Sequence, residues 1–164
     1  MLQDLLKLAI TYEESGVAFY QENQDRVSDP LAKKTFEWLA GMEADHVRFL
    51  QQWQQKEDLN QVPRLEVEEI PEFFETNLEK KHMEKKPPAG DFADLKIIRL
   101  AYLIEKDFVH FYRENAKRVS PGEGKEVLQT LAKWEEKHMQ LMKRLIDVIF
   151  HRNQIDGKLY PAPY

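Results

Sequence analysis

The chain has 164 residues, of which 42% are hydrophobic and 32% are charged, a composition typical of one soluble globular domain. The net charge is −5 and charges of both signs are interspersed, which argues against nucleic-acid binding; no apolar run approaches the roughly 20 residues that span a bilayer. There is no cysteine, which excludes disulfides and thiolate-bound metals within these residues. We therefore predict a cytoplasmic protein with no nucleic-acid or membrane partner, in which any metal centre uses oxygen and nitrogen ligands.

Helical periodicity dominates from residue 2 to about 55 and returns from about 91 to 152. In the first segment "VSDPL" (27–31) breaks the pattern, with a serine or an aspartate as N-cap before Pro30 at the first helical position. In the second segment "VSPGEGK" (119–125) breaks it in the same way. We therefore predict two helical hairpins, over residues 2–55 and 91–152.

Residues 56–90, between the hairpins, carry blocks of charge and four prolines, and a short helix is expected to begin after Pro71. Two hairpins joined by such a long crossover are typical of a ferritin-like four-helix bundle. We predict one all-α domain over residues 1–164, in which residues 153–164 form a C-terminal tail.

The two hairpins repeat each other at a constant shift of 92 positions. "FYQENQDRVS" (19–28) and "FYRENAKRVS" (111–120) are identical at seven of ten positions, and "LAGMEADH" (39–46) aligns with "LAKWEEKH" (131–138). The alignment needs no gap. We infer two halves related by a pseudo-two-fold axis, with equivalent residues converging at its centre.

Each hairpin carries a lone glutamate followed 30 residues later by a Glu-x-x-His pair. The members are Glu13 with Glu43 and His46 in the first hairpin, and Glu105 with Glu135 and His138 in the second. The spacing places both glutamates of an antiparallel hairpin at one height, because a helix rises about 1.5 Å per residue. Residues three apart share a helix face, and all four glutamates lie in apolar stripes. These six side chains are therefore predicted to meet in the core.

Four buried carboxylates without counter-charge would be very costly, whereas two divalent cations would balance them. Carboxylate and imidazole ligands with open positions suit iron or manganese better than the closed tetrahedral site that zinc prefers. We therefore predict a dinuclear site that holds two iron ions, with manganese or zinc as possible substitutes.

Two tyrosines each follow a lone glutamate by seven residues, two turns along the same helix face: Tyr20 and Tyr112. Their hydroxyls either find a local partner in the core or donate a hydrogen bond that orients a ligand carboxylate. The other histidines, His82, His110 and His151, lack the spacing and are predicted to lie at the surface or at helix caps.

"YEESGVAFY" with "FEWLAGMEADH", and "IEKDFVHFY" with "LQTLAKWEEKH", resemble the di-iron domain of the rubrerythrin family, within the ferritin-like superfamily. The resemblance covers both hairpins and implies that the six glutamates and histidines ligate iron and that Tyr20 and Tyr112 support them. The family usually carries a cysteine-ligated rubredoxin module, which is absent here, so the electron donor is expected to be a separate molecule. The family also has one more glutamate where this chain has Phe108, which makes the ligand set more symmetric, like that of bacterioferritin.

The resemblance implies a di-iron oxidoreductase of oxidative-stress defence. Such a protein would reduce hydrogen peroxide or dioxygen with electrons from an external donor protein, as a monomer or a homodimer. Two alternatives are a ferritin-like ferroxidase or iron-storage protein, and a structural bundle whose site holds zinc or no metal.

Overall fold

The computed structural model describes residues 2–64, 68–83 and 90–155, and in these ranges the chain is helical with no strand. The helices are α1 (Leu2–Asn23), α2 (Pro30–Gln54), α3 (Glu72–His82), α4 (Asp91–Arg118) and α5 (Glu123–Ile155). This is the all-α ferritin-like bundle that the periodicity predicts. None of the described helices has the length and apolarity needed to cross a membrane.

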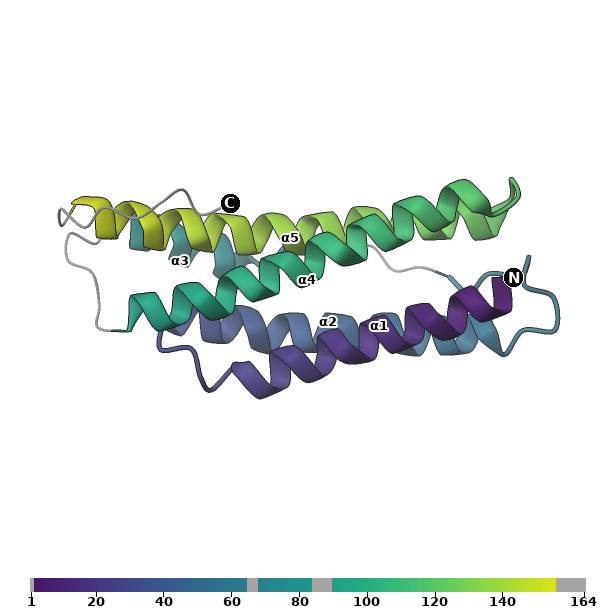
Figure 1. The fold of residues 1–164 in the computed structure, drawn as a ribbon, viewed down its shortest axis with the longest axis horizontal. Coiled ribbons are helices and arrows are strands. Elements are labelled where there is room, and N and C mark those ends of the chain that lie inside the picture. The colour runs from purple at the N-terminus through teal and green to yellow at the C-terminus, as the bar shows by residue number, and fades with distance from the viewer. Residues whose placement is uncertain (1, 65–67, 84–89, 156–164) are drawn as a thin grey trace.

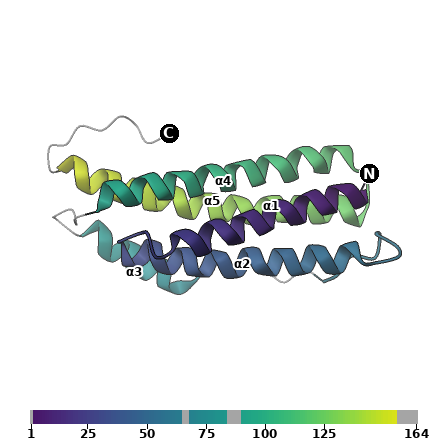
Figure 2. The same ribbon diagram turned by 60° about the horizontal axis from the view of Figure 1, so that its bottom comes forward.

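The bundle consists of two antiparallel hairpins, α1 with α2 and α4 with α5, which lie one above the other (Figure 1). The crossover returns along the molecule and forms α3, which packs against both α2 and α5 near one end of the bundle. A view turned by 60° shows that α1 and α4 run side by side on the side away from α3 (Figure 2). The crossover therefore covers the side of the bundle formed by α2 and α5.

The helix ends mostly follow the local signals in the sequence. Asp29 is the N-cap of α2, and its carboxylate accepts hydrogen bonds from two backbone N–H groups at 2.9 Å each, with Pro30 in the first turn. The short helix expected after Pro71 is α3. The last helix, α5, extends to Ile155, three residues beyond the predicted end at 152, and the remaining tail, residues 156–164, lies outside the described residues.

A buried group of charged side chains joins four elements at the end of the bundle where α2 and α4 begin. This end cluster consists of Asp29, Lys81, Asp91, Asp94 and Arg152. Arg152 of α5 donates to Asp91 of α4, with its Nε at 2.6 Å from Oδ2, and Lys81 of α3 pairs with Asp29. Asp94 accepts from two backbone N–H groups of the α1–α2 turn at 2.7 and 2.8 Å. The end cluster therefore ties both hairpins and α3 together.

The apolar core is divided into two buried clusters along the bundle. One includes Phe36, Ile98 and Leu141, toward the end cluster, and the other includes Leu50 and Leu128, toward the opposite end. In each helix of the two hairpins, the predicted glutamates and histidines fall between these two clusters in the sequence. The apolar packing thus places a polar layer at mid-height in the bundle.

Candidate metal centre

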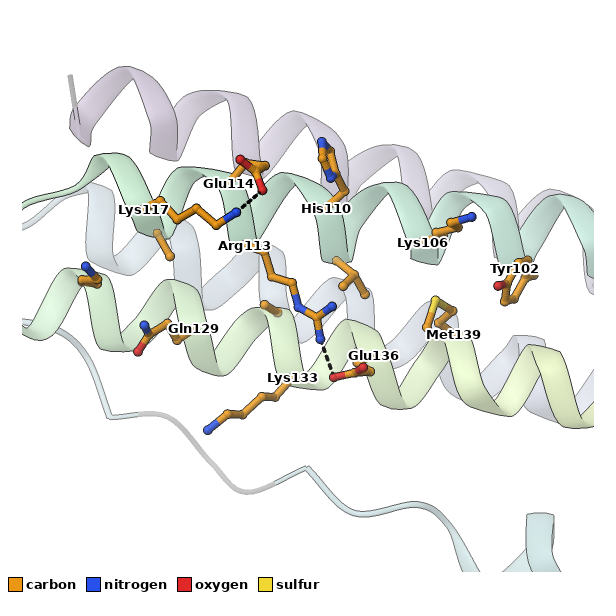
Figure 3. Close-up of a pocket in the computed structure, with 14 residues that line it drawn as sticks. Tyr102, Lys106, His110, Arg113, Glu114, Lys117, Gln129, Lys133, Glu136 and Met139 are labelled. Atoms are coloured by element: carbon orange, nitrogen blue, oxygen red, sulfur yellow. Dashed lines mark hydrogen bonds and ion pairs between the residues drawn. The ribbon is translucent and has the colours of Figure 1, made fainter.

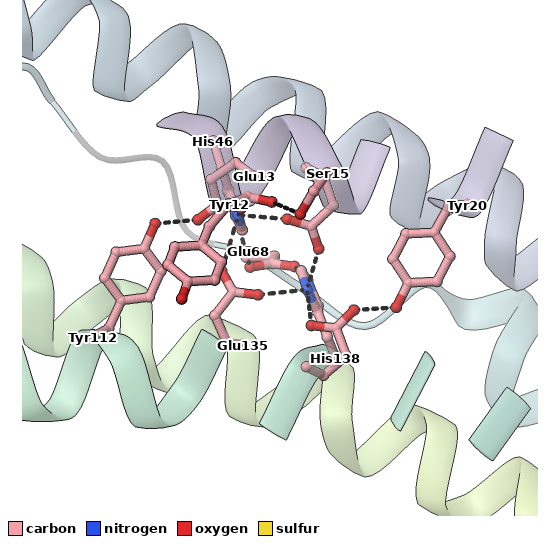
Figure 4. Close-up of polar contacts among 11 residues, drawn as sticks. Tyr12, Glu13, Ser15, Tyr20, His46, Glu68, Tyr112, Glu135 and His138 are labelled. Carbon is pink, nitrogen blue, oxygen red and sulfur yellow. Dashed lines mark hydrogen bonds and ion pairs between the residues drawn. The ribbon is translucent and has the colours of Figure 1, made fainter. Parts of the chain in front are cut away.

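The structure brings all six predicted glutamates and histidines together in this polar layer, and each is at most 2% exposed. They form two groups that each have the composition of a metal site: Glu13, Glu43, His46 and Glu135, and Glu43, Glu105, Glu135 and His138. Within each group the candidate ligand atoms lie within 4.8 Å of one another. Glu43 and Glu135 belong to both groups, whereas Glu13 and Glu105 each belong to one. Figure 4 shows Glu13, His46, Glu135 and His138 of these groups close together.

Both imidazoles present the same nitrogen to the carboxylates. The Nδ1 atom of His46 lies 3.1 Å from Glu135 Oε1 and 3.4 Å from an oxygen of Glu13. The Nδ1 atom of His138 lies 3.1 Å from Glu43 Oε1 and 3.3 Å from Glu135 Oε2. The two rings are nearly parallel, with centroids 5.6 Å apart and planes inclined by 9°. The centre therefore has the two-fold arrangement that the repeat predicts.

Each tyrosine donates to the lone glutamate of the other hairpin. Tyr20 on α1 donates to Glu105 Oε1 on α4, and Tyr112 on α4 donates to Glu13 Oε1 on α1. Both tyrosines are fully buried, and burial together with the neighbouring carboxylates raises the pKa of each hydroxyl well above its usual value. They therefore remain donors at neutral pH and fix one oxygen of each lone glutamate.

The carboxylates of this site lie close to one another, and this proximity shifts the pKa values of its residues. Burial and the charge of Glu43 raise the pKa of Glu13 to about 8, and the same two causes raise the pKa of Glu105 well above its usual value. For His46 and His138, burial acts to lower the pKa, but the surrounding carboxylates outweigh burial and raise it. Without metal the site therefore holds protons in place of cations.

Several buried oxygen atoms of the centre have no hydrogen-bond partner within the described residues. They are Glu43 Oε2, Glu105 Oε2 and both carboxylate oxygens of Glu135. Buried polar atoms are normally satisfied, so four such oxygens on three adjacent glutamates indicate a missing electropositive partner. Anionic oxygens and imidazole nitrogens are the ligands that divalent iron and manganese accept. The residues present therefore fit a pair of divalent metal ions.

Comparison with known protein families matches the rubrerythrin family over residues 4–146. The chain belongs to the rubrerythrin family. That family is ferritin-like and generally binds two iron ions, in agreement with the two overlapping groups of ligands. No curated protein and no solved structure matches the chain.

One position of this rubrerythrin-family centre is apolar and breaks the symmetry of the repeat. Phe108 is 2% exposed and lies on α4, while its equivalent on α1, 92 positions earlier, is Gly16. A Cβ atom on Gly16 would come within 3.1 Å of the Phe108 ring and 3.3 Å of Glu43 Cγ. The glycine therefore makes room for the phenylalanine ring, which closes the α1–α4 side of the centre with an apolar wall.

The structure adds a residue that the spacing argument missed, Glu68 of the crossover. Its side chain is 4% exposed, and its Oε1 is hydrogen-bonded to Nε2 of His138. Burial acts to raise the pKa of Glu68, but the hydrogen bond with His138 and the nearby His46 outweigh it and hold that pKa well below its usual value. Glu68 lies in a loop with other acidic residues and has no counterpart in the repeat, so no sequence signal distinguishes it.

Two tryptophans, which the sequence indicates only as packing or surface residues, contact the histidines. Trp134 stacks on the ring of His46, with centroids 5.2 Å apart, and Trp38 meets the ring of His138 edge-on at 5.8 Å. Of the histidines outside the repeat, His110 and His151 are exposed, while the side chain of His82 is outside the described residues. The ring contacts of the two tryptophans therefore limit the rotation of both histidine side chains.

A surface groove of about 980 Å³ lies between α4 and α5 (Figure 3). Among its lining residues the basic ones outnumber the acidic ones, with Lys106, Arg113, Lys117, Lys125 and Lys133 against Glu114 and Glu136. Arg113 is paired with Glu136 at 2.8 Å across the groove. None of the six site residues lines it, so we keep it separate from the metal centre.

Proposed function

We propose that the protein is a di-iron oxidoreductase that reduces hydrogen peroxide or dioxygen with electrons from a separate donor. The observation that carries this proposal is the pair of four-residue groups that share Glu43 and Glu135. Sharing two carboxylates is how proteins hold two metal ions close enough to act on one small molecule. Membership of the rubrerythrin family supports the choice of iron.

In this proposal each residue has a defined role at the centre. Glu43 and Glu135 would bridge the two ions, and Glu13 and Glu105 would each bind one of them. His46 and His138 would each complete one ion through Nδ1, the nitrogen that faces the carboxylates. Once bound, the two ferrous ions would supply the two electrons that, with two protons, convert hydrogen peroxide into two water molecules.

The protein itself would control position and access. Tyr20 and Tyr112 hold one oxygen of Glu105 and Glu13, so the other oxygen of each glutamate would be available to bind a metal ion. Phe108 keeps the α1–α4 side of the centre apolar, which limits the access of water. Because these 164 residues contain no cysteine, we propose that electrons for another cycle arrive from a redox group outside them.

The test is to load the protein anaerobically with two equivalents of ferrous iron and then add one equivalent of hydrogen peroxide. We expect both irons to be oxidised, with the optical bands of an oxo-bridged ferric pair, and re-reduction by an artificial donor should restore the reaction. A matched control is Glu105→Gln, which preserves the size of the side chain but removes a ligand charge. It should lose the ferric-pair spectrum while remaining folded.

Two results would contradict the proposal. Elemental analysis that finds only zinc, or no metal, after expression in iron-replete medium would favour a structural bundle. Oxidation by dioxygen with mineral accumulation inside a large hollow assembly, measured by sedimentation, would instead favour iron storage.

A further inference from the structure

Glu68 reaches the outer side of both histidines of the centre from the crossover (Figure 4). Its Oε1 is hydrogen-bonded to Nε2 of His138, and its Oε2 lies 3.7 Å from Nε2 of His46. Lys137 of α5 donates a hydrogen bond of 2.6 Å to the Glu68 carbonyl oxygen, which fixes this part of the crossover on the bundle. One carboxylate therefore faces two imidazoles.

The orientation of the rings makes this contact informative. A neutral imidazole carries one N–H group, and a ring that binds metal through Nδ1 must carry its proton on Nε2. Both Nδ1 atoms lie among the carboxylates of the centre, and both Nε2 atoms point toward Glu68. Two donors thus face the two oxygens of one acceptor.

The contact between Glu68 and His46 is slightly too long for a hydrogen bond, but each of its two atoms lacks any other partner in the described part of the chain. His46 Nε2 and Glu68 Oε2 are both buried and both lack a hydrogen-bond partner within the described residues, and they are 3.7 Å apart. A movement of less than about 1 Å would bring them to hydrogen-bonding distance. Neither helical repeat supplies an alternative: the residues four before the histidines, one helical turn away, are Met42 and Trp134, which offer no carboxylate.

We propose that Glu68 is the positioning residue for both metal-binding histidines, so that a single carboxylate of the crossover fixes both imidazoles with Nδ1 directed at the metal ions. The proposal rests on the metal-binding part of the proposed function. It gives the crossover a role at the centre, because the two metal positions then share one outer support as well as two glutamates. A carboxylate or carbonyl behind a ligand histidine typically changes metal affinity 10–100-fold.

The same three side chains, His46, Glu68 and His138, are also close enough to hold an ion themselves. That arrangement would bind metal through Nε2 and would leave Nδ1 protonated beside the glutamates. Each group on the Nδ1 side offers three carboxylates to a divalent ion, whereas the Nε2 side offers only Glu68 among the residues described, and this favours the positioning role. Metal stoichiometry separates the two cases.

The experiment compares the full chain with Glu68→Ala, Glu68→Gln and the control Glu69→Gln, which alters the exposed neighbour. Anaerobic titration with ferrous iron should give two ions per chain in all four proteins. We expect affinity to fall 10–100-fold in Glu68→Ala and to change little in Glu69→Gln. Glutamine has one carbonyl oxygen and therefore one acceptor group, so Glu68→Gln should weaken one ion more than the other.

Nitrogen NMR of the histidines in the zinc-loaded proteins gives a second readout that is independent of activity. The unaltered protein and Glu69→Gln should show both rings protonated at Nε2. Glu68→Ala should show mixed tautomers or broadened signals. Circular dichroism checks that each variant is folded, and the nearly isosteric Glu68→Gln keeps the test decisive if Glu68→Ala unfolds.

Three results would overturn the inference: unchanged affinity and tautomers in both Glu68 variants, a third ion that is lost in Glu68→Ala, or no metal binding in the unaltered protein. The first two leave the proposed function intact, because two ions remain at the glutamates. A protein that binds two ions and shows the expected tautomers but reacts with neither peroxide nor dioxygen would refute the proposed oxidoreductase and support the role of Glu68.

Discussion

The end cluster and the metal centre are both buried groups of charged residues, but only the end cluster is complete in itself. Each carboxylate oxygen of Asp29, Asp91 and Asp94 accepts a hydrogen bond from a lysine, an arginine or a backbone N–H group. The metal centre instead leaves oxygens of Glu43, Glu105 and Glu135 without a hydrogen-bond donor among the residues that the structure describes. Burial and composition are similar, so the difference lies in whether the chain provides its own counter-charges.

The charged residues of the end cluster are paired with one another and stabilise the fold, whereas the carboxylates of the candidate metal centre lack such partners within the described ranges. In the end cluster, the cations come from α3 and α5 and the anions from the starts of α2 and α4. In the metal centre, only the two histidines can carry positive charge, and they do so by taking up protons. The end cluster should therefore respond strongly to substitution, and the metal centre to pH and to metal.

The largest effect is expected from Arg152→Met, which removes the principal cation of the end cluster and leaves Asp91 buried without its charged partner. Breaking a buried ion pair in this way costs about 3–5 kcal/mol of unfolding free energy. The matched control is Arg144→Met, because Arg144 pairs with Glu75 at 2.6 Å but both side chains are more than a third exposed. Urea denaturation should show at most about 1 kcal/mol for this control, and equal losses in both variants would refute the comparison.

The metal-free centre should make stability fall as the pH rises. The folded-state pKa of Glu13 is about 8 against an ordinary 4.5, so its stabilising contribution is complete below pH 4.5 and is lost as the pH rises through 8. The raised pKa of both histidines acts in the same direction above pH 6.5. Between pH 6 and 8 we expect Glu13 alone to account for a loss of about 2–3 kcal/mol, at about 1.4 kcal/mol per pH unit.

Thermal and urea unfolding in the presence of a chelator measure this dependence. Glu13→Gln, which cannot ionise, should make the curve flatter, and bound metal should remove most of the slope because the cations replace the protons. A metal-free protein that becomes more stable from pH 6 to 8 would contradict the assignment of a crowded anionic centre.

A smaller effect is expected from Tyr20→Phe and Tyr112→Phe. Each substitution leaves one oxygen of a buried glutamate without its donor, which costs about 1–3 kcal/mol. Tyr12→Phe is the control, because the Tyr12 side chain is 37% exposed and packs on Phe108 and Phe111 through its ring. Its unfolding free energy should change by less than about 0.5 kcal/mol. Equal effects at all three positions would show that the tyrosine–glutamate bonds contribute nothing specific.

The smallest effect tests how tightly the apolar wall is packed. Replacing a helical glycine with alanine typically stabilises by about 0.5–1 kcal/mol, and Gly41→Ala on α2 should do so, since nothing lies within 4 Å of its added Cβ. Gly16→Ala should lose this gain because its Cβ meets Phe108 at 3.1 Å. Gly16→Ala with Phe108→Leu should recover part of it. If Gly16→Ala is as stable as Gly41→Ala, the Phe108 ring can move at little cost to accommodate the added methyl group.

The bundle and the meeting of the six residues followed from the sequence because both depend on periodic signals. Helical spacing identified the buried faces, and the repeat at 92 positions showed that two equivalent sets of side chains must converge. Glu13 and Glu43 lie a similar number of residues before and after the turn between α1 and α2. In an antiparallel hairpin, two such residues lie at the same height along the bundle axis, so their proximity could be predicted.

The features that were not predicted depend on segments without a period. Glu68 reaches the histidines through an irregular crossover, and its role follows only from where that chain passes over α2 and α5. The end cluster likewise joins residues 52–123 positions apart, among them Asp29, Lys81 and Arg152. Pairings of this kind are set by tertiary packing, which local patterns do not record.

The crossed tyrosines also have a consequence for the order of folding. Each hairpin can form from contacts that are local in the chain, but the Tyr20–Glu105 and Tyr112–Glu13 bonds join residues 85 and 99 positions apart. Closing such long loops is entropically costly, and we expect these bonds to form only when the two preformed hairpins dock. Burial of these two tyrosines would then mark the moment at which the six residues of the candidate metal centre first come together.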